Sequence, residues 1–224
     1  SLPSDPGSKS MEAVERMKSF DFFSEYFLPN IKLEDLMAIK EWIPKENSLV
    51  YEKKLYDEGL GKWVRKVSYP KTVTPSKQEA YQVYKDIFTI SEDSNSVFLT
   101  ISIEHQSPHV AKLWLDIIIN QINNSMIKRD SEQARKSIAY LNETAISTNI
   151  QSLKEVITNL LEKEMQTLML TASNEDYVFK KIDPPLVPEI KSGPSRSIIC
   201  ILGTFLGLMF SSLVAFILDF RKLF

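Results

Sequence analysis

A long stretch without glycine or proline sets the first constraint on how this chain can fold. It covers 75 residues between Pro108 and Pro184, so neither of the two residues that most often end helices interrupts it. Apolar residues recur at helical spacing in both halves of the stretch, which predicts two amphipathic helices. They are Val110, Leu113, Trp114, Ile117, Ile118 and Ile122 in the first half, and Leu153, Val156, Ile157, Leu160, Leu161, Met165 and Leu168 in the second.

These two helices are expected to form a long, coiled-coil-like hairpin within an extended helical region over residues 107–174. One continuous helix would carry the chain roughly 100 Å from where it began, and the uncharged run that starts at residue 197 requires the chain to return. The turn is placed in "NETAISTNIQS", residues 142–152, because Ser, Thr and Asn side chains compete for backbone hydrogen bonds.

Residues 1–106 are predicted to form the first part of an α+β base, in which short helices cover a small β-sheet. The segments "KLEDLMAIKEW" and "PSKQEAYQVYKDI" are expected to be helices, the second with Pro75 in its first turn. "GKWVRKVSY" alternates enough to be a strand, and "IFTI" and "VFLTISIEH" are expected to pair across the turn "SEDSNS". The residues that alternate as a strand with one buried face are Val97, Leu99, Ile101 and Ile103.

The segment after the helical hairpin is expected to add a strand to this sheet and then to continue as a semi-rigid connector. "DYVFKKI", residues 176–182, is β-prone and can add a strand from the other end of the chain. "DPPLVPEIKSGP", residues 183–194, has four prolines, which remove backbone donors and favour an extended, semi-rigid connector. Residues 175–196 are therefore predicted to be a returning strand and a proline-rich connector, with an ordinary linker as the alternative.

An uncharged run of 22 residues, 197–218, completes the predicted architecture. As a helix it would be roughly 33 Å long, enough to cross a hydrocarbon core of about 30 Å, and Arg196 and Asp219 bound it. A buried core helix is the alternative, but such a helix usually has a polar stripe. We therefore expect one transmembrane helix over 197–218, a short tail over 219–224 and a base that lies close to the membrane.

Composition and motifs argue against an enzyme and against a nucleic-acid-binding protein. The net charge of -2 implies no polyanion-binding surface, and only six glycines leave no Gly-rich phosphate loop. His105 and His109 have a spacing that can bind metal on a helix, but Pro108 lies between them. The isolated carboxylates, which lack a visible partner for acid–base chemistry, are Glu104, Asp183 and Glu189. No catalytic, cofactor-binding or metal site is predicted.

The C-terminal part of the chain resembles a known family. "YVFKKIDPPLVPEIKSGPSRSIICILGTFLG" is similar to the C-terminal signature of the Wzz-type chain-length determinants, the polysaccharide co-polymerases. In that signature prolines precede the second transmembrane helix, a basic residue stands at the membrane face and glycines lie inside the helix. "VFLTISIEHQSPHVAKLWLDIIINQIN" and "DSEQARKSIAYLNE" resemble the family's strand-then-helix segment and the start of its long helix. The matching signature positions are Pro185, Pro188, Pro194, Arg196, Gly203 and Gly207.

The resemblance implies a location and a function. Such proteins sit in the inner membrane of Gram-negative bacteria with most of the chain in the periplasm, form ring-like homo-oligomers and have no catalytic chemistry of their own. They set the length of O-antigen or related polysaccharides together with a Wzy-type polymerase that uses lipid-linked repeat units. For this chain the resemblance implies a non-enzymatic chain-length regulator with the tail 219–224 in the cytoplasm. Its implied partners are further copies of itself, the polymerase, the membrane, and polysaccharide or lipid-linked repeat units.

The chain departs from the family pattern at two places. Ser211 and Ser212 stand where the family often has further glycines, although small residues still permit helices to approach closely. The family's N-terminal transmembrane helix is not in the sequence, and we expect it to precede Ser1.

Other interpretations stay open. The basic residues around the uncharged run would place the body in the cytoplasm by the positive-inside rule, whereas the resemblance places it in the periplasm. An export co-polymerase for capsule or exopolysaccharide, acting with a separate kinase, is an alternative function. A tail-anchored coiled-coil membrane adaptor is another, although the β-hairpin and the prolines do not fit it.

Overall fold

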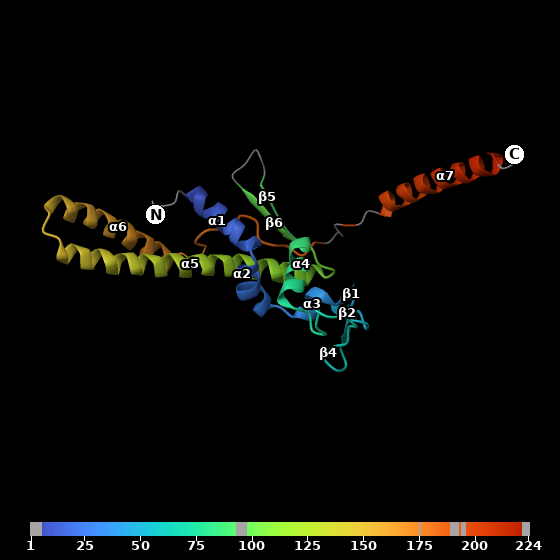
Figure 1. Cartoon of the computed structure of the whole chain (residues 1–224), viewed down its shortest axis with the longest axis horizontal. Coiled ribbons are helices and arrows are strands. Elements are labelled where there is room, and N and C mark those ends of the chain that lie inside the picture. The colour runs from blue at the N-terminus through green and yellow to red at the C-terminus, as the bar shows by residue number, and fades with distance from the viewer. Residues whose placement is uncertain (1–5, 93–97, 175, 189–192, 194–195, 221–224) are drawn as a thin grey trace. The chain divides into compact units, whose positions relative to one another are not determined.

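The computed structural model describes residues 6–92, 98–174, 176–188, 193 and 196–220, and it confirms an α+β fold. The chain divides into two compact units, one up to Val187 and one from Pro188 onward. The first unit begins with short helices and hairpins and continues with two long helices (Figure 1). Its elements are α1 (Pro6–Lys18), α2 (Phe20–Phe22), η1 (Phe23–Phe27), η2 (Leu28–Asn30), α3 (Leu33–Met37), β1 (Ile39–Ile43), β2 (Ser48–Tyr51), β3 (Tyr56–Asp57), β4 (Lys62–Trp63), α4 (Lys77–Ile87), β5 (Phe88–Glu92), β6 (Leu99–Ile103), α5 (Pro108–Ser147) and α6 (Gln151–Ser173).

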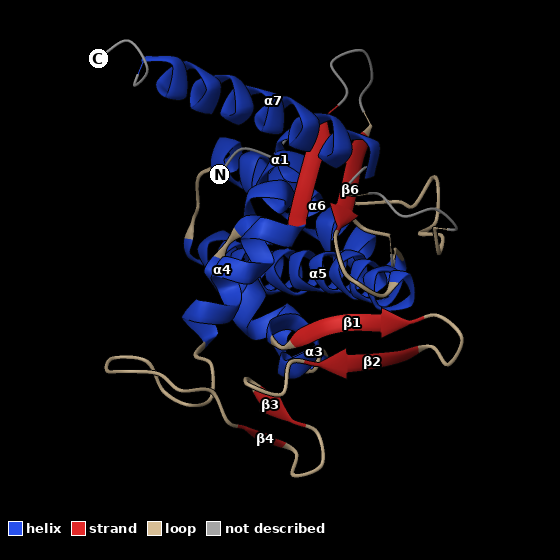
Figure 2. Cartoon of the chain, turned by 90° about the vertical axis from the view of Figure 1, so that its right-hand side faces the viewer, coloured by secondary structure: helices blue, strands red, loops and turns tan. Residues whose placement is uncertain are grey.

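The strands form three separate antiparallel hairpins, so the expectation of one small sheet is wrong. The pairs are β1 with β2, β3 with β4, and β5 with β6, and Figure 2 shows them as separate ribbons. The predicted hairpin between β5 and β6 is confirmed, with Ile90 opposite Ile101. Along β6 the side chains alternate between partly buried and exposed, as the sequence predicted, while Val97 lies outside the described residues. The β5–β6 hairpin packs Ile90, Leu99, Ile101 and Ile103 against the core, so it needs no second hairpin to cover that face.

Three local predictions were wrong. The helix expected over residues 32–42 ends at Met37, and residues 39–42 of that segment belong to strand β1, which pairs with β2. The strand expected over residues 61–69 is only two residues long, because Arg65 turns back toward α4 instead of continuing a ladder. Helix α4 begins after Ser76 rather than at Pro75. Ser76 accepts a hydrogen bond from the Glu79 backbone N–H, and the Glu79 carboxylate accepts one from Ser76, which forms a capping box.

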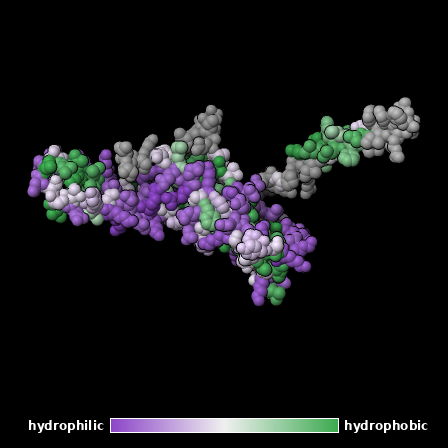
Figure 3. Space-filling view, viewed as in Figure 1, coloured by the Kyte–Doolittle hydropathy of each residue, from purple (hydrophilic) through white to green (hydrophobic). Residues whose placement is uncertain are grey.

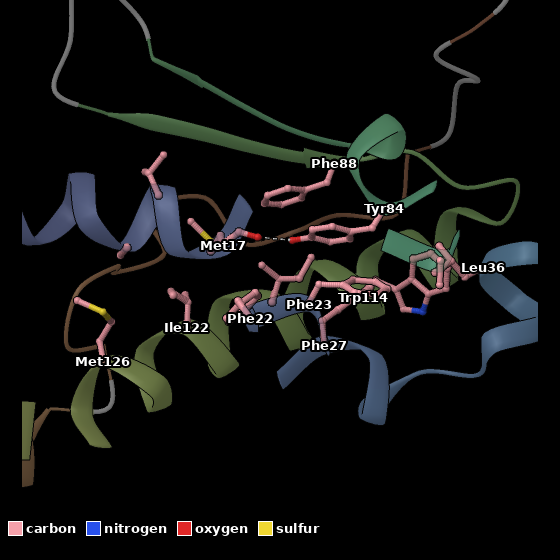
Figure 4. Close-up of a cluster of buried hydrophobic side chains, with 14 residues drawn as sticks. Met17, Phe22, Phe23, Phe27, Leu36, Tyr84, Phe88, Trp114, Ile122 and Met126 are labelled. Carbon is pink, nitrogen blue, oxygen red and sulfur yellow. Dashed lines mark hydrogen bonds between the residues drawn. The ribbon is translucent and has the colours of Figure 1, made fainter. Parts of the chain in front are cut away.

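The core of the first unit is an aromatic cluster between α1, η1, α4 and α5 (Figure 4). Trp114 of α5 meets the edge of the Phe27 ring at 5.7 Å between centroids, and Tyr84 of α4 lies 5.1 Å from the same ring. The Tyr84 hydroxyl donates to the Met17 carbonyl at 2.9 Å, so this buried polar tip is satisfied. The cluster joins the N-terminal helices to the base of α5.

Ser125 on α5 is the one buried side chain of the described residues whose polar atom has no hydrogen-bond partner. Replacing Ser125 by alanine is expected to raise the free energy of unfolding by about 1 kcal/mol, because the desolvation cost of the hydroxyl disappears. Urea unfolding of the full chain in mild detergent measures this change. The buried Ser107 provides a control of opposite sign, since its hydroxyl accepts from Val110 N–H and caps α5. Ser107→Ala should lower the free energy of unfolding by about 1 kcal/mol, and a loss of stability in Ser125→Ala would contradict the prediction.

The long helical hairpin is confirmed. Helices α5 and α6 lie side by side, and the chain turns at residues 148–150, inside the predicted segment 142–152 (Figure 1). Ile157 and Thr171 of α6 are buried, whereas several apolar side chains of α6 are not covered. These exposed side chains are Leu153, Val156, Leu160, Met165, Met169 and Leu170.

The second unit is built around helix α7 (Arg196–Phe220), which covers the uncharged run expected to be helical. Within the described part of the chain, none of the helices combines the length and the apolar character that crossing a membrane requires. The helix itself is therefore observed, while its transmembrane role stays a prediction.

Candidate functional site

The segment that leads from the helical hairpin to the connector, residues 176–187, is held along α5 (Figure 1). We call it the return segment. The sequence predicted a strand over 176–182, and this is wrong, since the described residues here form no strand. Three polar residues of α5 bind the return segment instead, at seven-residue intervals that place them on one face of the helix. They are Asp116, Asn123 and Asp130.

Asn123 binds the backbone of the return segment as a neighbouring strand would. Its Oδ1 accepts from the backbone N–H groups of Val178 and Phe179, both at 3.0 Å, and its Nδ2 donates to the Phe179 carbonyl at 2.9 Å. The residue is only 2% exposed, so water cannot replace these bonds. Because Asn123 already binds these backbone groups, the β-prone sequence needs no strand partner here.

Asp130 is the centre of a charged cluster that joins three parts of the chain. Lys9 of α1 donates to the Asp130 carboxylate at 2.9 Å and to the Tyr177 hydroxyl at 2.7 Å. The Tyr177 hydroxyl donates to the same carboxylate at 2.8 Å, and Arg129 donates to its other oxygen at 2.7 Å. Arg129 also pairs with Glu12 of α1. The cluster therefore ties α1 and the return segment to the same turn of α5.

The pKa of the Asp130 carboxyl reflects two opposing effects. Burial by itself raises it, but the hydrogen bonds from Lys9, Arg129 and Tyr177 outweigh burial and hold the pKa below its usual value. Burial also lowers the pKa of Lys9, and its hydrogen bonds to Tyr177 and Asp130 more than reverse this. Both shifts favour the charged forms, so the pair stays ionised around neutral pH.

The third contact lies close to the connector. Lys181 donates to the Asp116 carboxylate at 2.7 Å, and both side chains are about one-third exposed. The return segment thus passes Asp130, Asn123 and then Asp116 as it runs antiparallel to α5. These contacts determine where the chain leaves the first unit toward its prolines.

The structure places the residues of the predicted signature in different units. Pro185 belongs to the first unit and is partly buried. Pro188 is the first residue of the second unit. Arg196 begins α7, and Gly203 and Gly207 lie one turn apart within it. A Cβ atom added at either glycine would meet no described atom within 4 Å. Pro194 lies outside the described residues.

The two histidines lie in different environments and do not face a common site. His105 Nδ1 accepts from Ser107 N–H at 3.0 Å, and its Nε2 lies 3.1 Å from the Asp35 carbonyl, to which it donates in the neutral tautomer. The exposed His109 lies 5.9 Å from the Trp42 ring. Among the described residues, no group of three or more His, Cys, Asp or Glu side chains could hold a metal ion.

Lowering the pH from about 7 to 5 is expected to reduce the free energy of unfolding through His105. Burial lowers the pKa of His105 below its ordinary value of 6.5, against the backbone hydrogen bonds of Asp35 and Ser107. Between the lowered and the ordinary pKa, the unfolded chain binds a proton that the folded chain does not, so stability falls with the pH. His105→Asn should remove this pH dependence in urea unfolding, while His109→Asn should keep it. An unchanged pH dependence in His105→Asn would contradict the prediction.

Sequence reasoning did not find the three α5 residues that hold the return segment. A signal existed, because Asp116, Asn123 and Asp130 repeat every seven residues on a helix that also buries apolar residues such as Ile118 and Ile122. The repeat alone does not name the partners, which come from the two ends of the chain.

Comparison of the sequence with known proteins finds no family model that matches the chain and no curated protein that is similar to it.

Proposed function

We propose that this chain is a non-enzymatic regulator of the length of O-antigen or a related surface polysaccharide. It acts as a homo-oligomer in the bacterial inner membrane, with most of the chain in the periplasm and α7 as the membrane-spanning helix. Its partner is a Wzy-type polymerase. The resemblance of residues 97–210 to the Wzz-type co-polymerases supplies the function, and the α+β base with a long helical hairpin is consistent with it.

One structural observation carries the proposal: the helical hairpin projects beyond the base and leaves apolar side chains uncovered. Ile146 is 86% exposed and Ile150 61% exposed at the turn, and hydrophobic residues gather at this end of the first unit in Figure 3. The exposed face of α6 continues this surface with Val156 and Leu160. Large exposed apolar surfaces usually mark contacts with other proteins, and further copies of the same chain can cover this one.

The glycines of α7 provide the second support. Gly203 and Gly207 form a G-x-x-x-G pair on one face of the helix, where a neighbouring membrane helix can approach closely. Neither glycine has a side chain beyond its backbone, so a partner helix can come close at both positions. The upstream transmembrane helix, another subunit or the polymerase are the candidate partners.

The double substitution Gly203→Leu and Gly207→Leu is expected to shift or broaden the distribution of polysaccharide lengths. The leucines add bulk on the face where a second helix would pack, and α7 would still insert because its apolar character increases. The measurement is the polysaccharide ladder on a gel, from cells that lack the protein and express each variant, with the amount of protein in the membrane measured on the same samples.

Ser212→Leu is the matched control for the glycine pair. Ser212 lies nine residues after Gly203, about half a turn around the helix, so its substitution adds similar bulk to a different face. This control should restore the parental ladder. A parental ladder from the glycine variant would show that the glycine face is dispensable, and no change of the ladder on deleting the protein would overturn the proposed function.

A further inference from the structure

The loop between β4 and α4 combines positive charge with uncovered apolar side chains. Residues 60–78 contain five lysines and arginines and no aspartate or glutamate. Of residues 64–74, all but Arg65 are exposed. The exposed apolar side chains are Val64 at 41%, Val67 at 37%, Tyr69 at 97% and Val73 at 49%.

Arg65 holds this loop in a defined conformation. Its guanidinium makes a bidentate ion pair with Glu79 of α4, with N–O distances of 2.8 and 2.7 Å. The same side chain donates to the carbonyls of Val73 at 2.8 Å and Thr72 at 2.6 Å, so it closes the loop on itself. The hydrogen bond from Arg65, with those from the Ser76 backbone, lowers the pKa of Glu79 to about 2, so the clamp stays ionised at neutral pH. The loop therefore presents its side chains without first having to be ordered.

Among the described residues, Glu79 is the one acid that forms ion pairs with residues 64–74, so the loop keeps an excess of positive charge. Glu79 is already neutralised by Arg65, so Lys71, which lies 3.7 Å from Glu79, adds positive charge in excess. Lys66 is exposed on the same loop. Lys77 pairs with Glu25 and does not contribute to the excess. Lys66 and Lys71 thus flank the apolar tip formed by Val67 and Tyr69.

The loop also lies at the end of the first unit from which the chain leaves for α7. Figure 1 shows β1, β2 and β4 at the end opposite the turn between α5 and α6, and the return segment leaves at this same end. The contact of Lys181 with Asp116 independently places the end of the return segment beside the first turns of α5. The loop and the point where the chain leaves toward α7 therefore belong to the same end of the first unit.

We propose that the loop of residues 64–74 docks on the surface of an anionic lipid bilayer. Lys66 and Lys71 bind the anionic headgroups, and Tyr69 and Val67 enter the boundary between the headgroups and the acyl chains, where amphipathic aromatic residues are favoured. The valines favour a bilayer over an acidic polysaccharide, because a hydrated polysaccharide offers no apolar medium for them. The proposal rests on the proposed function only in that α7 holds the chain at a membrane.

The test follows an environment-sensitive fluorophore attached beside the apolar tip. The full chain, with Cys200→Ala to remove the native cysteine, carries Ser68→Cys for labelling and is reconstituted into vesicles of neutral lipid or of neutral lipid mixed with phosphatidylglycerol. The label is expected to shift its emission to shorter wavelength only in the anionic vesicles. High salt should reverse the shift, because the Debye length falls to about 3 Å at 1 M. A label at Ser152→Cys, an exposed serine at the start of α6, should show no lipid dependence.

Three variants separate the contributions of charge and apolar contact. Lys66→Gln and Lys71→Gln should each lower the ratio of docked to released loop about fivefold, since a lysine near an anionic surface contributes about that factor. Tyr69→Ser should weaken docking on the same vesicles while the charge is unchanged. These exposed positions do not carry the fold, so loss of folding does not confuse the result.

Two outcomes would overturn the proposal. The label at residue 68 could have the same emission in neutral and anionic vesicles, in which case the loop does not bind lipid. Alternatively, the emission of the label could shift when a soluble acidic polysaccharide is added to the protein in neutral vesicles, and not in anionic vesicles. That result would show that the loop binds glycan and not lipid. Polysaccharide ladders measure the proposed function separately. A loop that does not bind lipid would therefore not overturn the chain-length proposal, and a failed chain-length proposal would not overturn lipid binding by the loop.

Discussion

Replacing Asn123 by leucine is expected to release the return segment from α5 and to lower the free energy of unfolding by about 3 kcal/mol. The leucine keeps the approximate volume of the side chain but removes the partners of two backbone N–H groups and one carbonyl, at Val178 and Phe179. Hydrogen exchange of these two amides should become at least about tenfold faster, since the segment opens more easily than the rest of the unit. Hydrogen-exchange mass spectrometry and urea unfolding of the full chain measure the two effects.

The adjacent Asn124 gives a closely matched control. Its side chain is exposed on the same turn of α5, so Asn124→Leu should change the free energy of unfolding by no more than about 0.5 kcal/mol. Equal exchange rates at Val178 and Phe179 in both variants would show that Asn123 does not hold the return segment.

Replacing Asp130 by alanine is expected to lower the free energy of unfolding by about 3 kcal/mol, because it leaves cationic groups without their acceptor in a largely buried place. Lys9 and Arg129 both donate to this carboxylate, whose side chain is 11% exposed. Tyr177 loses its acceptor as well, so the start of the return segment should also exchange faster. Thermal or urea unfolding at neutral pH measures the change.

Glu132 provides the control for the charge. It is exposed on α5 two residues after Asp130, so Glu132→Ala removes one negative charge from the same region. This substitution should change the free energy of unfolding by no more than about 0.5 kcal/mol. The stability of Asp130→Asn should lie between those of the parent protein and Asp130→Ala, because the amide oxygen can still accept hydrogen bonds but the ion pair is lost. If Asp130→Ala and Glu132→Ala had the same stability, the cluster would contribute nothing to holding the chain ends.

Much of the local structure could be read from the sequence because it depends on periodicity. Trp114 and Ile118 follow helical spacing and are buried in α5, and the turn of the helical hairpin lies among the Ser, Thr and Asn residues that disfavour a helix interior. Ile101 and Ile103 alternate with exposed residues in β6. Neighbouring residues in the chain decide these features, so no distant partner has to be known.

The errors arose where a distant partner overrides a local preference. The alternation around Arg65 predicted a strand, but its guanidinium binds Glu79, fourteen positions away, together with two carbonyls of its own loop. The segment around Val178 is β-prone, yet the carboxamide of Asn123 provides the hydrogen bonds that a strand would have provided. The β-propensity of a segment does not depend on which distant side chain binds its backbone, so it could not predict these contacts.

The sequence by itself determined the helical hairpin, its turn, the β5–β6 pair and the uncharged C-terminal helix, because short-range periodicity and turn chemistry are sufficient for each of them. It also contained the proline and glycine pattern on which the proposed function rests. Only the tertiary structure decided that the strands form three separate hairpins and that the return segment lies along α5. The physical reason is that these outcomes depend on contacts such as that between Lys9 and Tyr177, 168 positions apart, whose free energy exists only once the core has brought the two ends together.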